Sequence, residues 1–545
     1  MDKYNFDFNE VGVTTENGAK SYSTTGSVIV DQFGKAGNYR NRELDDVFSD
    51  QKALWDSNAL IALRFPFYLR MITRKIKVNE SNITQKVQKG QGVRDESFKR
   101  LLWIAKNEED AFYKHIWALP LVGSWKDLWT IMFYDIKFEV NCIKHEILFE
   151  LINEGLKSTS HSELIKKYMP RIKSNGKCTT DWSQITNMLA KKYANFNGMT
   201  YREYNKLKTS GTAHDFQKLI CSGRYSDINW GTIPGRALST LINGNFLEAH
   251  GLTKKYIKWL ISQPTVKSTG YPYELARKVI NSLSGYVGDS VNKTRKLNMP
   301  IYEQVTINKQ FDELVRKASD GGTPLGNVWC ALDTSGSMTS SVSKNTDVSA
   351  IDVCISLGVF LSSLNKGAFH KNVIMFGDES RVKQLDGDFC EMIRSIFSED
   401  VAWGSTNFMS VIEEIVRVRK KNPNIPLEQF PDSIVVISDM QFNIPYNENY
   451  TTNFEKMKEK LYEVFPKEFV DNMKFIWWQV TSRTNDYPAE IGPGETFISG
   501  FDGSILSLIL GGEVKEIEKK KGRPLTSEET IKIALSQEIL QLINI

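Results

Sequence analysis

The sequence predicts a multidomain protein in which an all-α helical array is followed by a doubly wound α/β domain. Three observations support this. A chain of 545 residues is too long for one hydrophobic core. Its middle part repeats apolar residues at helical spacing, and its C-terminal part alternates short apolar strands with amphipathic helices. With 41% hydrophobic and 25% charged residues, the composition is that of an ordinary globular protein.

Residues 1–48 are rich in Ser, Thr, Asn and Gly and predict an irregular N-terminal arm. Residues 49–320 form the predicted helical domain, in which Leu54, Leu60, Leu63 and Phe67 begin the helical spacing. Further helices are expected at 98–105, 111–116, 125–133, 139–156, 162–168, 180–193, 201–207, 213–221, 235–242, 253–262, 273–283 and 301–318. Short polar connections between antiparallel helices favour a stacked array, although no fixed-period repeat is visible.

Residues 321–513 predict the α/β domain. The apolar strand NVWCAL is expected to be followed by helix 348–364, strand 372–376, helix 408–418, strand 433–438, helix 454–464, strands 474–480 and 496–499, and helix 502–510. Such alternation predicts a parallel sheet covered on both faces, with ligands at the carboxyl ends of the strands. Residues 514–545 predict a C-terminal helix over 527–543, which Thr526 and Glu529 begin as a capping box.

Charge is distributed unevenly along the chain. Residues 49–320 hold 42 Lys and Arg against 26 Asp and Glu, whereas residues 321–545 hold 22 against 31. A basic region beside an acidic one favours a polyanionic partner for the basic region. The alternative is that these lysines only solvate helical surfaces.

Several classes of protein are not expected. No run of eighteen apolar residues is present, so no membrane span is predicted, and the polar, acidic opening MDKYNFDFNEVG predicts no signal peptide. The six cysteines are scattered without CxxC pairs. This pattern predicts reduced thiols, no zinc site, and a cytoplasmic location or a virus-associated one in a reducing compartment.

Oxygen-bearing side chains follow three of the predicted strands. Asp333, Ser335 and Ser337 lie in the loop after the first strand, Thr406 lies before a helix, and Asp439 directly follows the strand SIVVIS. Hard oxygen ligands of this kind suit Mg²⁺ first, with Mn²⁺ or Ca²⁺ as alternatives. The other interpretation is that Asp333 and the serines only cap a turn.

No enzymatic constellation accompanies these residues. A phosphotransferase of this fold would need an acid where Ser335 stands, and a serine hydrolase would need GxSxG with a histidine, whereas His370 is the domain's one histidine. No GxxxxGK[ST] loop for nucleotide phosphates occurs. The sequence therefore predicts a non-enzymatic protein without a nucleotide cofactor.

The DTSGS motif at 333–337, the Gly-Ser-Thr loop at 404–406 and the strand that leads into Asp439 resemble the metal-ion-dependent adhesion site of von Willebrand A domains. The resemblance implies that all five residues hold a divalent cation and that an acidic group of a protein partner completes its coordination. Asn407 departs from many intracellular members, which have Asp there.

Four stretches, at 89–105, 119–132, 222–241 and 499–510, resemble the TROVE architecture of Ro-type ribonucleoproteins, and more closely an uncharacterised TROVE-like group of plants and viruses. The resemblance implies a HEAT-like helical repeat array, with ring closure left open, that binds structured or single-stranded RNA.

Clustered bases are the expected phosphate contacts, with nearby aromatic residues as stacking partners for unpaired bases. The bases are Arg70, Arg74, Lys75, Lys77, Lys166, Lys167, Arg171, Lys173, Lys177, Lys254, Lys255 and Lys258, and the aromatic residues are Tyr68, Tyr168, Tyr256 and Trp259. The alternative for each is a solvated lysine or a core aromatic ring. The sequence thus predicts an RNA-binding protein with a cation-dependent partner site. The alternative function is a metal-dependent protein scaffold, or a structural component of an assembly such as a virus particle, without RNA.

Overall fold

The computed structural model describes residues 12–14, 20–22, 24–38, 42–77, 85–174, 177–210, 215–268, 270–287, 294–320, 327–343, 346–398, 406–442, 453–481, 494–501, 506 and 510–545. The chain divides into two compact units. The first unit comprises Met1–Arg40 and Pro234–Ala534, and the second unit comprises Asn41–Ile233 and Leu535–Ile545. Each unit is therefore built from two separate parts of the sequence.

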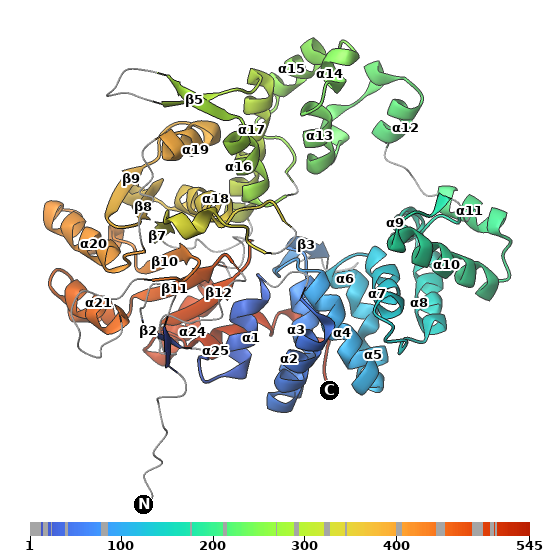
Figure 1. Cartoon of the computed structure of the whole chain (residues 1–545), viewed down its shortest axis with the longest axis horizontal. Helices are drawn as coiled ribbons and strands as arrows, with labels where there is room; N and C mark the ends of the chain where they lie inside the picture. The colour runs from blue at the N-terminus through green and yellow to red at the C-terminus, as the bar shows by residue number, and fades with distance from the viewer. Residues whose placement is uncertain are drawn as a thin grey trace, which may run out of the picture. The chain divides into compact units, whose positions relative to one another are not determined.

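The core of the first unit is a six-stranded sheet in the order β12-β11-β10-β7-β8-β9 (Figure 1). Its strands are β7 (Val328–Asp333), β8 (Asn372–Phe376), β9 (Ser380–Gln384), β10 (Ser433–Ser438), β11 (Lys474–Gln479) and β12 (Glu495–Ser499). Five strands are parallel, as the sequence predicts, and their continuous apolar runs are buried. The edge strand β9 is antiparallel and was not predicted, because its sequence SRVKQ is polar and half-exposed.

The helices of the first unit are α1 (Val28–Ala36), α13 (Gly235–Ile242), α14 (Phe246–Ala249), α15 (Thr253–Ser262), α16 (Pro272–Asn281), α17 (Ile301–Asp320), α18 (Ala350–Leu364), α19 (Phe389–Ser398), α20 (Met409–Lys421), α21 (Asn453–Tyr462), α22 (Lys467–Asp471), α24 (Gly512–Lys521) and α25 (Ser527–Ala534). The apolar helix α18 packs along β7, whereas α20 packs against β8 and β9 (Figure 1). The Ser349 side chain begins α18, where it accepts a hydrogen bond from the Asp352 N–H.

The prediction of an irregular N-terminal arm is wrong for residues 28–36, which form helix α1, and for residues 44–48, which begin helix α2 (Leu44–Ser57). Ile29, Val30 and Phe33 are buried, and α1 packs against β12. The Asn38 side chain donates hydrogen bonds to the carbonyls of Gln479 and Thr481. The apolar residues of a nine-residue segment are too few to reveal this partner from the sequence.

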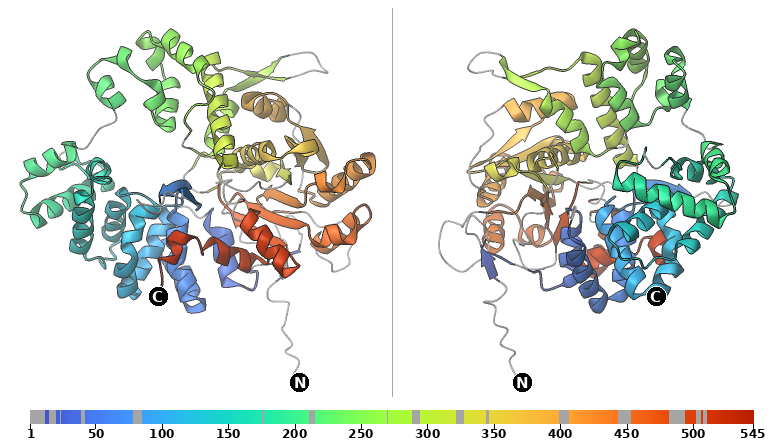
Figure 2. Two further views of the ribbon diagram at one scale, coloured as in Figure 1. Left: turned by 180° about the vertical axis from the view of Figure 1, so that it is seen from behind. Right: turned by 45° about the vertical axis from the view of Figure 1, so that its right-hand side comes forward.

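The second unit is mostly helical. Its helices are α2 (Leu44–Ser57), α3 (Ala59–Arg70), α4 (Asp95–Asn107), α5 (Glu109–His115), α6 (Leu119–Val122), α7 (Lys126–Lys137), α8 (His145–Lys157), α9 (Ser162–Tyr168), α10 (Asp181–Phe196), α11 (Tyr201–Ser210), α12 (Asp215–Cys221) and α26 (Glu538–Gln541). Among the blue to green ribbons of Figure 2, helix α3 packs against α2 and α4, α4 packs against α5, and α8 packs against α9. The chain end joins this unit through α26, where Gln537 and the backbone of Lys89 exchange two hydrogen bonds.

Most predicted helices are confirmed, and several details need correction. Helices α19 and α24 were not predicted. The helix expected at 139–156 begins only at His145, because Glu139 and Asn141 adopt positive φ angles of 55° and 51°. The helix expected over 527–543 is interrupted between α25 and α26. Three small antiparallel pairs were not predicted, namely β1 (Gly12–Thr14) with β2 (Lys20–Tyr22), β3 (Arg74–Lys77) with β4 (Gln85–Gln88), and β5 (Leu283–Val287) with β6 (Thr294–Leu297). The helix expected at 502–510 lies outside the described residues.

The boundary between the two units lies between Ile233 and Pro234, not at the predicted residue 320. Helices α13–α17 belong to the unit that contains the sheet, and the preceding helices belong to the other unit. Within the described part of the chain, no helix combines the length and apolar character that a membrane crossing requires.

Candidate metal centre and candidate nucleic-acid interface

Two acidic residues meet at the carboxyl edge of the sheet. Asp333 is the last residue of β7, and Asp439 directly follows β10. The two strands are neighbours in parallel register, with Ile437 opposite Leu332. Their ends therefore coincide, as the sequence predicts for consecutive polar loops of a parallel sheet.

Hydrogen bonds order the loop that carries the first three predicted ligands. The Ser335 N–H donates to Oδ1 of Asp333 at 2.9 Å, and the hydroxyls of Ser335 and Ser337 lie 3.1 Å apart. The Ser438 hydroxyl donates to Oδ2 of Asp333 at 2.5 Å. Asp333, Ser335 and Ser337 thus share one small polar cluster at the end of β7.

Thr406 reaches the same edge of the sheet from another loop. It is buried, and the next residue, Asn407, donates its N–H to the carbonyl of Gly377 at 2.9 Å. Gly377 follows β8, whose Phe376 pairs with Asp333. Gly404 and Ser405 of the predicted loop lie outside the described residues.

The electrostatics of this edge favour a cation. Asp333 is fully buried, and burial, followed by the charge of Asp439, raises its pKa above the usual value of an aspartate. Among the described residues, no Lys, Arg or His forms an ion pair with Asp333. Two carboxylates and three hydroxyls are the hard oxygen donors that Mg²⁺ prefers, so the residues present fit the ion.

The backbone after Asp439 is strained. Met440 has a φ of 66°, which is uncommon for a residue with a side chain, and its N–H bonds to the Ser438 hydroxyl at 2.9 Å. The Gln441 N–H donates to Oδ1 of Asp439 at 3.2 Å. The described residues contain no group of three or more His, Cys, Asp or Glu suited to a metal, so a cation here would depend on the hydroxyls.

A basic groove lies on the second unit. It has a volume of about 510 Å³ and is lined by Ile172, Lys173, Ser174, Lys191, Tyr201, Arg202 and Asn205. Three lining residues are cationic, and none of the lining residues that the structure describes is acidic. The segment from Arg171 to Ser210, which supplies all of them, holds eight Lys and Arg against two Asp and Glu.

An aromatic ring accompanies the cations of the groove. Tyr201 is 44% exposed at the start of α11, and the Lys191 ammonium lies 5.8 Å from the centre of its ring. The neighbouring carboxylate of Glu203 accepts hydrogen bonds from the Thr200 N–H and hydroxyl at the start of the helix. The groove therefore combines positive charge with a ring surface, as single-stranded nucleic acid requires.

Further cations lie beside the groove. Burial, followed by the charge of Arg171, lowers the pKa of Lys208, whose ammonium donates to the Lys167 carbonyl at 3.1 Å. The ring of Tyr168 lies under the Lys167 ammonium at 5.6 Å. Arg171, Lys173 and Lys177 are exposed, whereas Lys166 and Lys167 are half-buried.

Some predicted nucleic-acid contacts need correction. Arg70 is only 1% exposed and pairs with the buried Asp127 at 2.7 Å, so its guanidinium does not face solvent. Tyr68 is buried, and Tyr256 is buried with its hydroxyl 2.8 Å from that of Thr306, so both rings are core residues.

The remaining predicted bases fall on separate elements. Arg74, Lys75 and Lys77 form strand β3, and their side chains lie outside what the structure describes. Lys254, Lys255 and Lys258 are exposed on α15, which belongs to the first unit. Of the nine predicted bases whose side chains the structure describes, only Lys173 lines the groove.

Sequence reasoning missed Lys191, Tyr201 and Arg202. The sequence does show the basic pair Lys191–Lys192 and an aromatic residue, Tyr201, directly before the basic Arg202. Their convergence depends on the packing of α10 against α11, and no sequence spacing encodes it.

Comparison with known proteins gives three similarities. A family model described as a domain of unknown function (DUF7788) matches residues 328–539. An uncharacterized protein of Acanthamoeba polyphaga mimivirus is 23% identical over 541 residues, covering 92% of this chain and 84% of the relative. The crystal structure of the Deinococcus radiodurans RO (RSR) protein matches with a TM-score of 0.45 at 13% identity, covering 89% of this chain and 99% of that one. The chain is thus similar over most of its length to a viral protein, and the family model spans both acidic residues of the candidate metal centre.

Proposed function

We propose that the chain is a non-enzymatic RNA-binding protein and that the basic groove of the second unit holds the RNA. The observation that carries the proposal is the set of Lys173, Lys191 and Arg202 around the exposed ring of Tyr201, without an acidic residue among the described lining. Cations neutralise backbone phosphates, and an exposed ring stacks on an unpaired base. The choice of RNA over DNA follows from the sequence resemblance to Ro-type ribonucleoproteins.

Fluorescence anisotropy with a small structured RNA that ends in a single strand tests the proposal. Changing Lys173, Lys191 and Arg202 together to Gln should weaken binding by at least tenfold, because three phosphate contacts are lost. Tyr201→Ala should weaken binding by roughly 1–3 kcal/mol if its ring stacks on a base.

The matched control changes Lys366, Lys421 and Lys467, which are exposed in the first unit, to Gln. This variant loses the same charge and should bind within about twofold of the native chain. A third variant with Lys254, Lys255 and Lys258 changed to Gln tests the cluster on α15. Equal losses in the groove and control variants would overturn the proposal, because only general charge would then matter.

A second candidate function is divalent-cation-dependent binding of a protein partner. It is supported by the buried Asp333 carboxylate, with Asp439 beside it and no ion pair to Asp333 among the described residues. Asp333, Ser335, Ser337, Thr406 and Asp439 would hold the ion, which would supply a Lewis-acidic position for a partner's carboxylate.

Calorimetric titration with Mg²⁺ and Mn²⁺ tests this candidate. Asp333→Ala should abolish cation binding while the circular dichroism spectrum keeps its helical signal. Asp386→Ala, an exposed acidic residue of the same unit, is the matched control and should bind the cation normally. Retained binding in Asp333→Ala would exclude this site. Ribonuclease digestion of the native complex separates the two functions, because only RNA binding predicts a protected fragment.

A further inference from the structure

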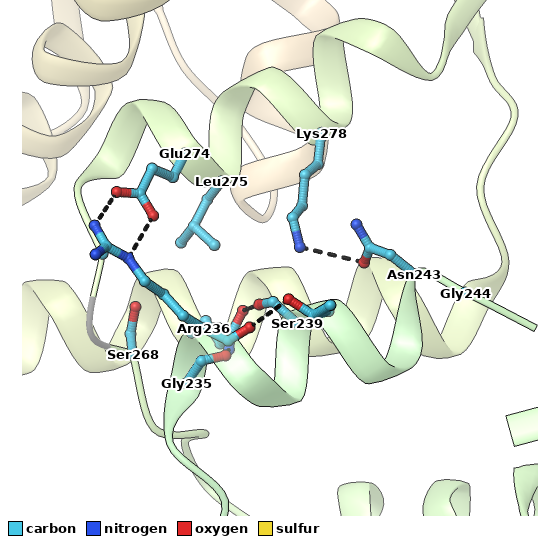
Figure 3. A pocket seen from close by; sticks show the side chains of 12 residues that line it. Gly235, Arg236, Ser239, Asn243, Gly244, Ser268, Glu274, Leu275 and Lys278 are labelled. Atoms are coloured by element: carbon cyan, nitrogen blue, oxygen red, sulfur yellow. Dashed lines mark hydrogen bonds and ion pairs between the residues drawn. The ribbon is translucent and has the colours of Figure 1, made fainter. Parts of the chain in front are cut away.

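A second pocket lies in the first unit, between helices α13, α16 and α17 (Figure 3). Its volume of about 530 Å³ is that of a small-molecule site. The lining residues are Gly235, Arg236, Ser239, Thr240, Asn243, Gly244, Ser268, Gly270, Glu274, Leu275, Lys278 and Gln310. Side chains of α13 and α16 reach toward each other across the pocket in Figure 3, so a ligand would meet two opposite walls.

Three charged residues line the pocket, and two of them form an ion pair with each other. Arg236 and Glu274 form a two-point ion pair, in which Nε donates to Oε2 at 3.0 Å and the second contact joins Nη2 and Oε1. These two charges cancel. Lys278 is the remaining charged residue of the lining, and among the described residues no carboxylate forms an ion pair with its ammonium.

Lys278 is held in place by an amide instead of an acid. Its Nζ donates to Oδ1 of Asn243 at 3.2 Å. Burial lowers the pKa of Lys278, whereas the more distant charges of Glu303 and Glu274 act in the opposite direction. A half-buried ammonium with one described hydrogen bond has two further N–H groups to offer.

Other donors of the pocket also remain available. Ser268 is only 4% exposed, and no described residue bonds to its hydroxyl, while its carbonyl accepts from Lys317 at 2.9 Å. No described residue accepts from the amide nitrogen of Asn243, whose oxygen is taken by Lys278. The hydroxyl of Ser268 therefore adds to the wall of the pocket a polar group that can donate and accept a hydrogen bond.

We propose that this pocket binds a small phosphate monoester of a hydroxylated molecule, such as a sugar phosphate or a nucleoside monophosphate. The phosphate accepts hydrogen bonds from Lys278 and from the Asn243 amide, because its three acceptor oxygens match these donors. The hydroxylated part bonds to Ser268 and packs on Leu275. A bare phosphate ion would fill only a small part of the volume, which is the reason for choosing an ester. The inference does not depend on RNA binding, because the pocket and the groove lie in different units.

Asn243→Asp gives a sharp test in the full-length chain. It keeps the shape of the side chain and places a carboxylate 3.2 Å from the Lys278 ammonium, where it neutralises that charge and repels phosphate. Calorimetric titrations with ribose 5-phosphate, a nucleoside 5′-monophosphate and inorganic phosphate should show saturable binding of at least one ester by the native chain. Asn243→Asp and Lys278→Met should each weaken that binding at least tenfold, and Ser268→Ala should weaken it less.

The matched control is Asn245→Asp, which adds the same charge at an exposed residue outside the lining and should bind within about twofold of the native chain. Thermal unfolding verifies that each variant is folded. The inference is overturned if the native chain binds neither ester, or if Asn243→Asp and Lys278→Met bind as the control does. If inorganic phosphate binds as tightly as the esters, the pocket does not recognise the hydroxylated part. A further titration with citrate tests for the phosphate group, because a citrate affinity equal to that of the esters would show that any small anion binds.

Discussion

At the scale of single residues, Arg70 shows how burial changes the role of a charged side chain. Its guanidinium pairs with Asp127, both side chains are at most 3% exposed, and Gly123 leaves room beside them. Removing one member of a buried pair leaves the other charge uncompensated. We therefore expect Arg70→Met to lower the free energy of unfolding by about 3–5 kcal/mol in urea denaturation.

The double variant Arg70→Met with Asp127→Leu is the control for this prediction, and it should recover most of the stability because no buried charge is left alone. RNA affinity should be unchanged in the double variant. A loss of RNA affinity without a loss of stability would mean that Arg70 contacts phosphate after all.

The sequence alone is enough to place some of these charged residues and not others. Asp333 and Asp439 could be placed together from the sequence, because the ends of neighbouring parallel strands coincide. Arg70 and Lys173 look alike in the sequence, since each lies among other bases. The difference is that Arg70 is buried beside Asp127, which lies 57 residues later in the sequence and pairs with its guanidinium.

At the scale of elements, the contact between α18 and β7 supports the candidate metal centre. A Cβ at Gly358 of α18 would lie 2.3 Å from Cδ2 of Leu332, a fully buried residue of β7 directly before Asp333. Overpacking costs about 1–3 kcal/mol, and the higher helix propensity of Ala offsets roughly 1 kcal/mol of it.

We therefore expect Gly358→Ala to lower the midpoint of thermal unfolding and to weaken cation binding by moving β7. Gly285→Ala, where a Cβ would meet nothing within 4 Å, should leave both unchanged. An unchanged midpoint in Gly358→Ala would show that α18 can move away from the sheet without cost.

The start of α25 gives a prediction about pH. The predicted capping box is confirmed, because the Thr526 N–H donates to Glu529 Oε2 at 2.9 Å and the Glu529 N–H donates to the Thr526 hydroxyl at 3.3 Å. Arg523 also pairs with Glu529 at 2.9 Å, and it is the main cause of a pKa of Glu529 well below its usual range. A carboxylate with a lowered pKa stabilises the fold above the pKa of the unfolded chain, about 4.3, and loses that effect as pH falls.

Glu529→Gln should therefore reduce the free energy of unfolding by roughly 1 kcal/mol at pH 7, the usual size of a capping contribution. The difference between the native chain and the variant should shrink steadily below about pH 4.3. Thermal unfolding at pH 7 and pH 3.5 measures both values. A difference that grows toward acid pH would contradict the assigned role of Glu529.

Elements were predicted well where one strong local pattern decides the structure. The strands β8 and β10 and the helices α9, α13 and α15 have the predicted bounds, since apolar runs or helical spacing define them. Helix α1, the edge strand β9 and the small hairpins were not predicted. Their few apolar residues gain stability only from partners that are distant in the sequence.

At the scale of the whole molecule, tertiary contacts decide which helices belong together. Phe311 of α17 stacks on Phe389 of α19 at 4.1 Å, and Arg277 of α16 pairs with Asp347 and Asp352 near the start of α18. These contacts join α16 and α17 to α18 and α19, and α18 packs on the sheet. The helical spacing of α16 and α17 nevertheless resembles that of the preceding helices. A sequence pattern gives the type of each element, and it does not give the partner.

The uneven distribution of charge gives the last prediction. Residues 49–320 carry an excess of bases, and residues 321–545 carry an excess of acids. When RNA binds, the bases of residues 49–320 should neutralise its phosphates and release the counterions that the RNA had held. The logarithm of the binding constant should fall linearly with the logarithm of the salt concentration between about 50 and 200 mM, by about 0.7 for each phosphate contact with a single strand. The variant with Lys173, Lys191 and Arg202 changed to Gln should reduce that slope by about 2, because three contacts are removed. The variant with Lys366, Lys421 and Lys467 changed to Gln should keep the native slope. A weaker affinity with an unchanged slope would mean that the groove residues act through stacking or folding and not through phosphate contacts.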